Sequence, residues 1–291
     1  MHSVLAELLT GGPVVTDGAW GTQLQARGLS VGDFPDAWNL THPEQVTAVA
    51  RAYVEAGSQV ILTNTFGANR IRLGEQGMGD QAGEINRRGV ELSRQATHGR
   101  ARVFASIGPT GKLLLSGEIT ADEVRSAFAQ QAQALASAGA DALVVETMSD
   151  LEEAKLAVSA ARETGLPVVA CVVFDSGKDK DRTMMGNTPE QAAESLTAAG
   201  ADVMGANCGQ GIAGFVPICR RLHAATQLPL WIKPNAGLPI VVDGRVQYQT
   251  TPQDFVQYVP ELLKTGASFI GGCCGTSPAF IAAVAKAIGK R

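Results

Sequence analysis

The apolar positions of this 291-residue chain fall into two alternating patterns. Short apolar runs rich in β-branched residues recur eight times, and most show no alternation of polar and apolar residues. Strands that are covered on both faces have this pattern. We therefore predict eight buried strands, over Pro13–Thr16, Gln59–Thr63, Arg102–Ile107, Ala142–Glu146, Pro167–Phe174, Asp202–Asn207, Pro229–Lys233 and Ser268–Gly272.

Segments with helical spacing of apolar residues lie between the predicted strands. Asp150 and Thr188 are residue types that favour the N-terminal cap of a helix, and Pro189 follows at a position that proline favours. These patterns predict helices over Pro43–Ala56, Ala121–Ala138, Asp150–Thr164, Pro189–Ala199, Ile212–Thr226 and Pro252–Lys264.

A short sequence motif with a glycine at the expected end of a helix recurs along the chain. It contains Gly57, Gly139, Gly200 and Gly266, and it precedes only the second, fourth, sixth and eighth strands. Glycine is the expected residue just after a helix. The first, fifth and seventh strands open with proline instead. This paired alternation favours an α/β fold of the (β/α)8 TIM barrel type over an open doubly wound sheet, and we expect one domain over residues 1–291.

Composition narrows the functional classes. The chain is 45% hydrophobic and 18% charged, with a formal net charge of −4. It has no basic stripe for nucleic acid and no apolar run near the roughly 20 residues that cross a bilayer. We expect neither a nucleic-acid nor a membrane partner. Five cysteines in a chain of this size indicate a reducing, cytoplasmic location.

Acids, amides and thiols follow several predicted strands. In a TIM barrel the chemistry lies where strands run into the following loops. The rim of this barrel would carry Asp17, Glu146, Asn207, Asn235 and three cysteines. A hairpin with an Asp-Gly turn, predicted over Ile240–Tyr248, would border the mouth.

Three cysteines are expected at this rim. Cys208 follows the sixth strand, and the adjacent Cys273 and Cys274 follow the eighth, in a glycine-rich segment with the backbone freedom to turn both side chains to one point. The adjacent pair alone would also fit a vicinal disulfide or two inert buried thiols. With a third thiol near, it predicts an open tetrahedral zinc site. Cys171 and Cys219 lie inside a strand and a helix, so we expect them to be buried.

An open zinc site with three thiolate ligands favours one kind of chemistry. It is a weak Lewis acid toward carbonyls, but it deprotonates an incoming thiol, whose pKa is ordinarily near 8.5. The bound sulfur stays electron-rich, so the site predicts alkyl transfer to sulfur. A different class remains open: a non-catalytic zinc or thiol-sensing barrel, or a redox protein that cycles Cys273 and Cys274.

Seven motifs together resemble the homocysteine S-methyltransferase family, which includes the homocysteine-binding barrels of cobalamin-dependent methionine synthases and free-standing bacterial relatives. The resemblance runs from about Val14 to Ala282. It implies a zinc-dependent enzyme that methylates homocysteine to methionine, with Cys208, Cys273 and Cys274 as zinc ligands. The motifs are Asp17-Gly-Ala-Trp-Gly, Thr63-Asn-Thr-Phe-Gly, Gly108-Pro-Thr-Gly, Glu146-Thr, Asn207-Cys, Pro234-Asn-Ala-Gly and Gly271-Gly-Cys-Cys-Gly-Thr.

The resemblance also implies the roles of other residues. Asn235 would occupy the fourth zinc position until the substrate thiolate displaces it. Asp17 and Glu146 would hold the amino-acid end of homocysteine, where an ammonium needs carboxylate acceptors. The backbone N–H groups of Gly18 and Ala19 would serve its carboxylate.

The methyl donor is less well specified. It could be a separate corrinoid protein, a sulfonium such as S-methylmethionine, or a betaine-type ammonium. Relatives that use S-methylmethionine tend to carry arginine after the paired cysteines, where this chain has Gly275. This departure disfavours a sulfonium donor.

Overall fold

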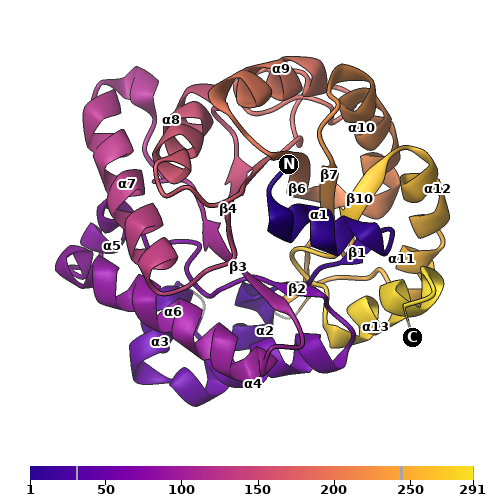
Figure 1. Cartoon of the computed structure of the whole chain (residues 1–291), viewed down its shortest axis with the longest axis horizontal. Helices are drawn as coiled ribbons and strands as arrows, with labels where there is room; N and C mark the ends of the chain where they lie inside the picture. The colour runs from indigo at the N-terminus through magenta and orange to yellow at the C-terminus, as the bar shows by residue number, and fades with distance from the viewer. Residues whose placement is uncertain (31, 243–244, 291) are drawn as a thin grey trace.

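A computed structural model of the protein describes residues 1–30, 32–242 and 245–290. Eight parallel strands form one sheet in the neighbour order β1-β10-β7-β6-β5-β4-β3-β2, and helices surround it (Figure 1). The predicted (β/α)8 barrel is confirmed. The barrel strands are β1 Val14–Val15, β2 Val60–Ile61, β3 Arg102–Ile107, β4 Ala142–Met148, β5 Val168–Val172, β6 Val203–Gly211, β7 Leu230–Asn235 and β10 Ala267–Ile270.

Helices follow the strands and also fill two long loops after β1 and β2. The α-helices are α1 Ser3–Thr10, α2 Gly21–Gln25, α3 Trp38–Thr41, α4 Pro43–Glu55, α5 Arg70–Gly74, α6 Ala82–Thr97, α7 Ala121–Ser137, α8 Leu151–Arg162, α9 Pro189–Ala199, α10 Ile212–Ala225, α11 Pro252–Val256, α12 Val259–Lys264 and α13 Pro278–Ala287. Three short 3-10 helices are η1 Pro35–Ala37, η2 Gly79–Gln81 and η3 Leu114–Ser116.

The seam between β1 and β2 closes the barrel, and side chains complete it. Gln59 donates its backbone N–H to the Val15 carbonyl oxygen (2.8 Å), while its side-chain oxygen accepts from the Val15 N–H (3.2 Å). Two residues after Val15, the Asp17 carboxylate accepts the Leu62 backbone N–H at 2.7 Å. Asp17 therefore has a structural contact at the rim.

Inward-facing side chains fill the barrel, and α1 covers its lower end. In Figure 1, α1 lies across the middle of the ring of strands. Its Leu5 packs with the interior residues, so the helix closes this end of the apolar interior. The interior cluster contains Leu5, Val14, Val60, Leu62, Phe104, Ala142, Val144, Val169, Cys171, Val203, Trp231 and Phe269.

The recurring glycines end helices as the sequence predicts. Gly57, Gly139, Gly200 and Gly266 all have positive φ angles, between 92° and 106°. A side chain is strained in this conformation, whereas glycine adopts it freely. The four glycines turn α4, α7, α9 and α12 into β2, β4, β6 and β10.

Two predicted elements differ from the structure or lie partly outside it. The single helix predicted over Pro252–Lys264 is two helices, α11 and α12, because Pro260 lacks an N–H and its ring would clash with the Val256 carbonyl in a continuous helix. The predicted hairpin forms the antiparallel strands β8 Ile240–Val242 and β9 Arg245–Gln247, but its Asp-Gly turn lies outside the described residues. Within the described ranges, no helix is both long and apolar enough to span a bilayer.

Candidate metal and substrate site

Three thiols meet at the carboxyl ends of β6 and β10. The Sγ atoms of Cys208, Cys273 and Cys274 all lie within 4.8 Å of one another, and the Cys208 and Cys274 sulfurs are 3.8 Å apart. All three side chains are half-buried. Cys208 has a left-handed backbone (φ 63°) at a point where the pairing of β6 with β7 shifts register. Strain of this kind is typical of functional sites, and here it turns the Cys208 sulfur toward the paired cysteines.

The glycines beside the paired cysteines serve two different purposes. Only Gly275 has a positive φ angle (81°), so the expected backbone freedom is used there. Gly271 and Gly272 allow close approach instead, because a Cβ atom at either position would clash with Thr16 or Thr276. The backbone is then fixed to β7, since the Cys273 N–H donates to the Pro234 carbonyl oxygen at 2.8 Å.

Asn235 lies at the end of β7 with its side chain beside the thiols. Its amide hydrogen-bonds the Cys208 sulfur. The side chain is 4% exposed, yet its Oδ1 atom has no hydrogen-bond partner among the described residues. A buried carbonyl oxygen without a donor is costly. An oxygen left in this state beside three thiols fits a fourth metal ligand.

The three thiols share negative charge. Hydrogen bonds from Cys273, Cys274 and Asn235 lower the pKa of Cys208 to about 3. The same contact with Cys208 raises the pKa of Cys273 and that of Cys274. The hydrogen bonds within the cluster therefore favour the thiolate form of Cys208 over that of the other two cysteines. A soft cation would replace the remaining protons and bind all three sulfurs.

Glu146 stands at the end of β4, on the pocket side of the thiols. Its two carboxylate oxygens accept hydrogen bonds from Ser106 Oγ (2.5 Å) and Asn207 Nδ2 (3.2 Å). The side chain is 6% exposed, and burial raises its pKa. The Asn207 Oδ1 atom also accepts the Thr147 N–H, and its Nδ2 atom donates to Thr147 Oγ1. The φ angle of Thr147 is 60°. Asn207 therefore sets the position of the carboxylate.

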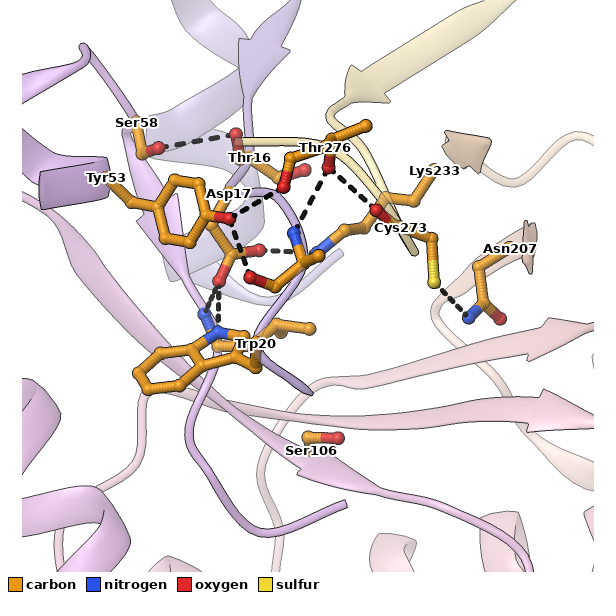
Figure 2. Close-up of polar contacts among 12 residues, drawn as sticks. Thr16, Asp17, Trp20, Tyr53, Ser58, Ser106, Asn207, Lys233, Cys273 and Thr276 are labelled. Carbon is orange, nitrogen blue, oxygen red and sulfur yellow. Dashed lines mark hydrogen bonds and ion pairs between the residues drawn. The ribbon is translucent and has the colours of Figure 1, made fainter. Parts of the chain in front are cut away.

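Asp17 is fully buried and its carboxylate is already engaged. One oxygen accepts from Trp20 Nε1 and from the Leu62 N–H, both at 2.7 Å. The other forms an ion pair with Lys233, whose side chain is 2% exposed (Figure 2). The structure thus places Asp17 at the site, but with protein partners on both oxygens.

The segment after β1 is held by Thr276 and Tyr53. Thr276 Oγ1 accepts the Ala19 N–H at 3.1 Å, and the Tyr53 hydroxyl donates to the Ala19 carbonyl oxygen at 2.6 Å (Figure 2). A Cβ atom at Gly18 would lie 2.7 Å from the Tyr53 hydroxyl, so only glycine fits. Of the two backbone donors predicted for the substrate carboxylate, that of Ala19 is therefore already used.

The three thiols, Glu146 and Lys233 line one cavity of about 530 Å³ at the mouth of the barrel, and Asp17, Asn207 and Asn235 lie behind this lining. The thiols, Glu146 and Lys233 line its floor. The two long loops after β1 and β2 build its outer part, where Trp20, Phe34, Phe66 and Arg72 lie. The Arg72 guanidinium carbon is 5.7 Å from the centre of the Phe34 ring and 6.0 Å from that of Phe66.

The structure brings together every residue that the sequence predicts at the site. Sequence reasoning missed the roles of Lys233, Asn207, Ser106 and Thr276. The signal for Lys233 was a charged residue at the end of an otherwise apolar strand. The structure confirms that Cys171 and Cys219 are buried away from the thiol cluster.

Comparison with known proteins gives a consistent result. Residues 14–288 match the family model described as homocysteine S-methyltransferase. The chain is 32% identical to the methionine synthases of Mycobacterium tuberculosis (strain H37Rv) and Mycobacterium leprae. Each alignment covers 98% of this chain but 25% of the relative, so the chain spans about a quarter of the length of these proteins.

Solved structures with this architecture include the homocysteine methyltransferase MmuM from Escherichia coli. Its metallated form has a TM-score of 0.80 and 25% identity, covering 96% of this chain and 97% of that one. Its oxidized form has a TM-score of 0.79 and 25% identity, covering 97% of this chain and 99% of that one.

Proposed function

Because the chain belongs to the homocysteine S-methyltransferase family, we propose that it transfers a methyl group to the sulfur of homocysteine and forms methionine. The observation that carries this proposal is a cavity lined by three thiols and a buried carboxylate, with the Asn235 amide beside the thiols and its oxygen without a donor among the described residues. A redox or sensing role for Cys273 and Cys274 is not favoured, because it gives no reason for a carboxylate held beside them.

The proposed metal is zinc. Zn²⁺ binds cysteine sulfur in tetrahedral geometry, and catalytic zinc sites combine three protein ligands with an exchangeable fourth position. Cys208, Cys273 and Cys274 would supply the sulfurs, and Asn235 would supply the fourth ligand through Oδ1 until the substrate arrives. Zinc held in this way would keep the substrate sulfur deprotonated at neutral pH.

The floor of the cavity would hold the amino-acid end of homocysteine. Glu146 is the first acceptor for the ammonium, because its carboxylate lines the cavity and is held in place by Ser106 and Asn207. Asp17 would contact the ammonium only by giving up part of its bonding to Trp20 or Lys233. Gly18 remains a proposed backbone donor for the carboxylate.

The methyl donor would approach from the outer part of the cavity. The thiolate sulfur forms a bond to the methyl carbon while the bond from that carbon to the donor breaks, and its electron pair leaves with the donor. We propose a separate methyl-corrinoid protein as the donor and retain sulfonium and betaine donors as alternatives. The Tyr248 ring occupies the space that a side chain at position 275 would need, consistent with Gly275 in place of arginine.

Zinc-edge X-ray absorption with and without homocysteine tests the proposal. The spectrum should change from three sulfur ligands to four, with loss of one oxygen or nitrogen ligand, and binding should release about one proton near neutral pH. An assay of methionine formation with methylcobalamin, S-methylmethionine and betaine then identifies the donor. A spectrum that keeps three sulfurs at saturating homocysteine would rule out thiol ligation and the proposed reaction with it.

A further inference from the structure

Lys233 is a buried cation for which the proposed reaction has no role. It lies in β7 between Trp231 and Asn235, and alternate residues of a strand point to the same face. Trp231 belongs to the interior cluster of the barrel, and the Lys233 Nζ atom is 5.9 Å from the centre of its ring. The side chain therefore rises from the interior into the floor of the cavity.

The ammonium group of Lys233 has more donors than the protein uses. It can give three hydrogen bonds. Among the described residues it bonds only to Asp17. A lysine that is 2% exposed cannot rely on water for its other donors, and an unmet donor on a buried charge is costly.

Acidic side chains also outnumber basic side chains around the cavity floor. Asp17 and Glu146 both lie near Lys233, so two acids surround one base. A homocysteine molecule whose sulfur lies at the thiol cluster brings one ammonium and one carboxylate to this floor. The ammonium suits Glu146, whereas the carboxylate needs a cation or N–H donors. The Ala19 N–H is already bonded to Thr276, which leaves the Gly18 N–H as the proposed backbone donor and Lys233 as the cation that lines the cavity.

We propose that Lys233 binds the α-carboxylate of the substrate amino acid and thereby selects thiols that carry a carboxylate. This inference rests on the proposed function, because it takes homocysteine as the ligand. Asp17 then has a second role: it holds the Lys233 side chain in a fixed direction, and Trp20 and Leu62 hold Asp17.

Truncated ligands test the inference on the zinc-loaded protein. 3-Mercaptopropylamine is homocysteine without its carboxylate, and 4-mercaptobutanoate is homocysteine without its ammonium. Calorimetric titration should show that Lys233→Met weakens the binding of homocysteine and of 4-mercaptobutanoate about 10- to 100-fold, as expected for loss of a charge-assisted hydrogen bond. Binding of 3-mercaptopropylamine should change less than about 3-fold by the same reasoning.

Three further variants keep the experiment decisive. Lys233→Met leaves Asp17 buried without a cation, so the double variant Lys233→Met, Asp17→Asn provides a neutral pair if the single variant folds poorly. Glu146→Gln should show the opposite selectivity, weakening 3-mercaptopropylamine and sparing 4-mercaptobutanoate. Lys264→Met, on the exposed end of α12, should leave all three affinities unchanged.

The outcomes separate this inference from the proposed function. Equal loss of affinity for all three ligands in the Lys233 variants would overturn the inference, because Lys233 would then act only by supporting Asp17. Failure of the unmodified zinc protein to bind homocysteine would overturn the proposed function, and the inference would fall with it. Selective loss for the two carboxylate ligands would support both.

Discussion

Single residues at this site work mainly by holding other residues. The Asn207 side chain is one example, because its amide hydrogen-bonds the Glu146 carboxylate and the backbone N–H and hydroxyl of Thr147. Asp17 is another, since it closes the β1–β2 seam through Leu62 and orients Lys233. The proposed metal-ligating and substrate-binding groups are thus set in place before any ligand arrives, which would reduce the entropic cost of binding.

Replacement of any one of the three clustered cysteines should remove most of the metal. Cys208→Ser, Cys273→Ser and Cys274→Ser each delete one of three soft ligands, and the purified variants should hold far less than the roughly one Zn²⁺ per chain expected of the unmodified protein. Metal analysis by mass spectrometry measures this.

Cys219→Ser is the matched control. The Cys219 sulfur lies 3.6 Å from the Thr265 carbonyl oxygen, so a hydroxyl there has an acceptor and the fold should persist with its full metal content. Full zinc retention in Cys273→Ser would contradict the site.

Asp36 should make stability depend on pH. Its carboxylate accepts the Gly67 N–H at 2.9 Å, and burial raises the pKa of Asp36 from 3.8 to about 6. Because the folded-state pKa is above the unfolded value, the protein loses stability as pH rises between about 4 and 6. Asp36→Asn should remove this loss, so that the variant gains about 2–3 kcal/mol relative to the unmodified protein from pH 4 to pH 7.

Urea unfolding at the two pH values measures the effect. Asp33→Asn is the control, because Asp33 is exposed on the same loop and its replacement should leave the pH dependence as it is. A stability difference between Asp36→Asn and the unmodified protein that is equal at both pH values would refute the assignment.

At the scale of elements, the sequence predicted strands and helices well where local rules decide. The helix ends at Gly57, Gly139, Gly200 and Gly266 follow from one residue type in one conformation. The break near Pro260 follows from a local rule as well, but the apolar spacing across it masked the signal. The length of β1 could not be predicted, because its seam with β2 depends on side chains that are distant in sequence.

At the site, too, features that depend on local sequence were predictable and contacts between distant residues were not. The three cysteines were predictable because thiols at strand ends are rare and chemically specific. The partners of Asp17 were not, because its contact with Lys233 joins residues 216 positions apart. Only the closed barrel brings β1 and β7 near each other through β10.

The N-terminal cap of α9 should contribute measurably to stability. Thr188 accepts the Gln191 N–H, and the Gln191 side chain accepts the Thr188 N–H in return. Thr188→Ala removes one of these bonds, so the free energy of unfolding should fall by about 1 kcal/mol. Chemical denaturation measures it.

Glu194→Ala, on an exposed position of α9, serves as the control for the cap. Alanine is a good helix former, so this variant should be as stable as the unmodified protein or slightly more so. Equal loss of stability in both variants would show that α9 is sensitive to any change rather than to its cap.

At the scale of the whole molecule, the proposed zinc site joins strands that are far apart in the chain. Its ligands come from the ends of β6, β7 and β10, and the pairing of β10 with β1 completes the sheet. A ligand that binds only the folded state stabilises it by an amount that grows with the logarithm of the ratio of free ligand concentration to dissociation constant. A metal bound at the proposed site would therefore stabilise the barrel as well as take part in its chemistry.

Removal of the metal should lower the melting temperature. A zinc concentration about 100 times the dissociation constant stabilises the folded state by about 2.7 kcal/mol, which corresponds to a shift of several degrees. Calorimetry before and after chelation measures this shift. Cys273→Ser should melt at the same temperature with and without chelator, and a similar drop in that variant would mean that the chelator acts elsewhere.

The pairing of β1 with β10 also has a consequence for the order in which the protein forms. During synthesis the first strand emerges more than 250 residues before the strand that must lie beside it, at Val14 opposite Phe269. Contacts between such distant residues are slow to form and leave sheet edges open in the meantime. Cys273 and Cys274 are made later still. A nascent chain therefore has no complete site for the metal until residues through Cys274 have left the ribosome, and we expect metal loading to follow barrel closure rather than guide it.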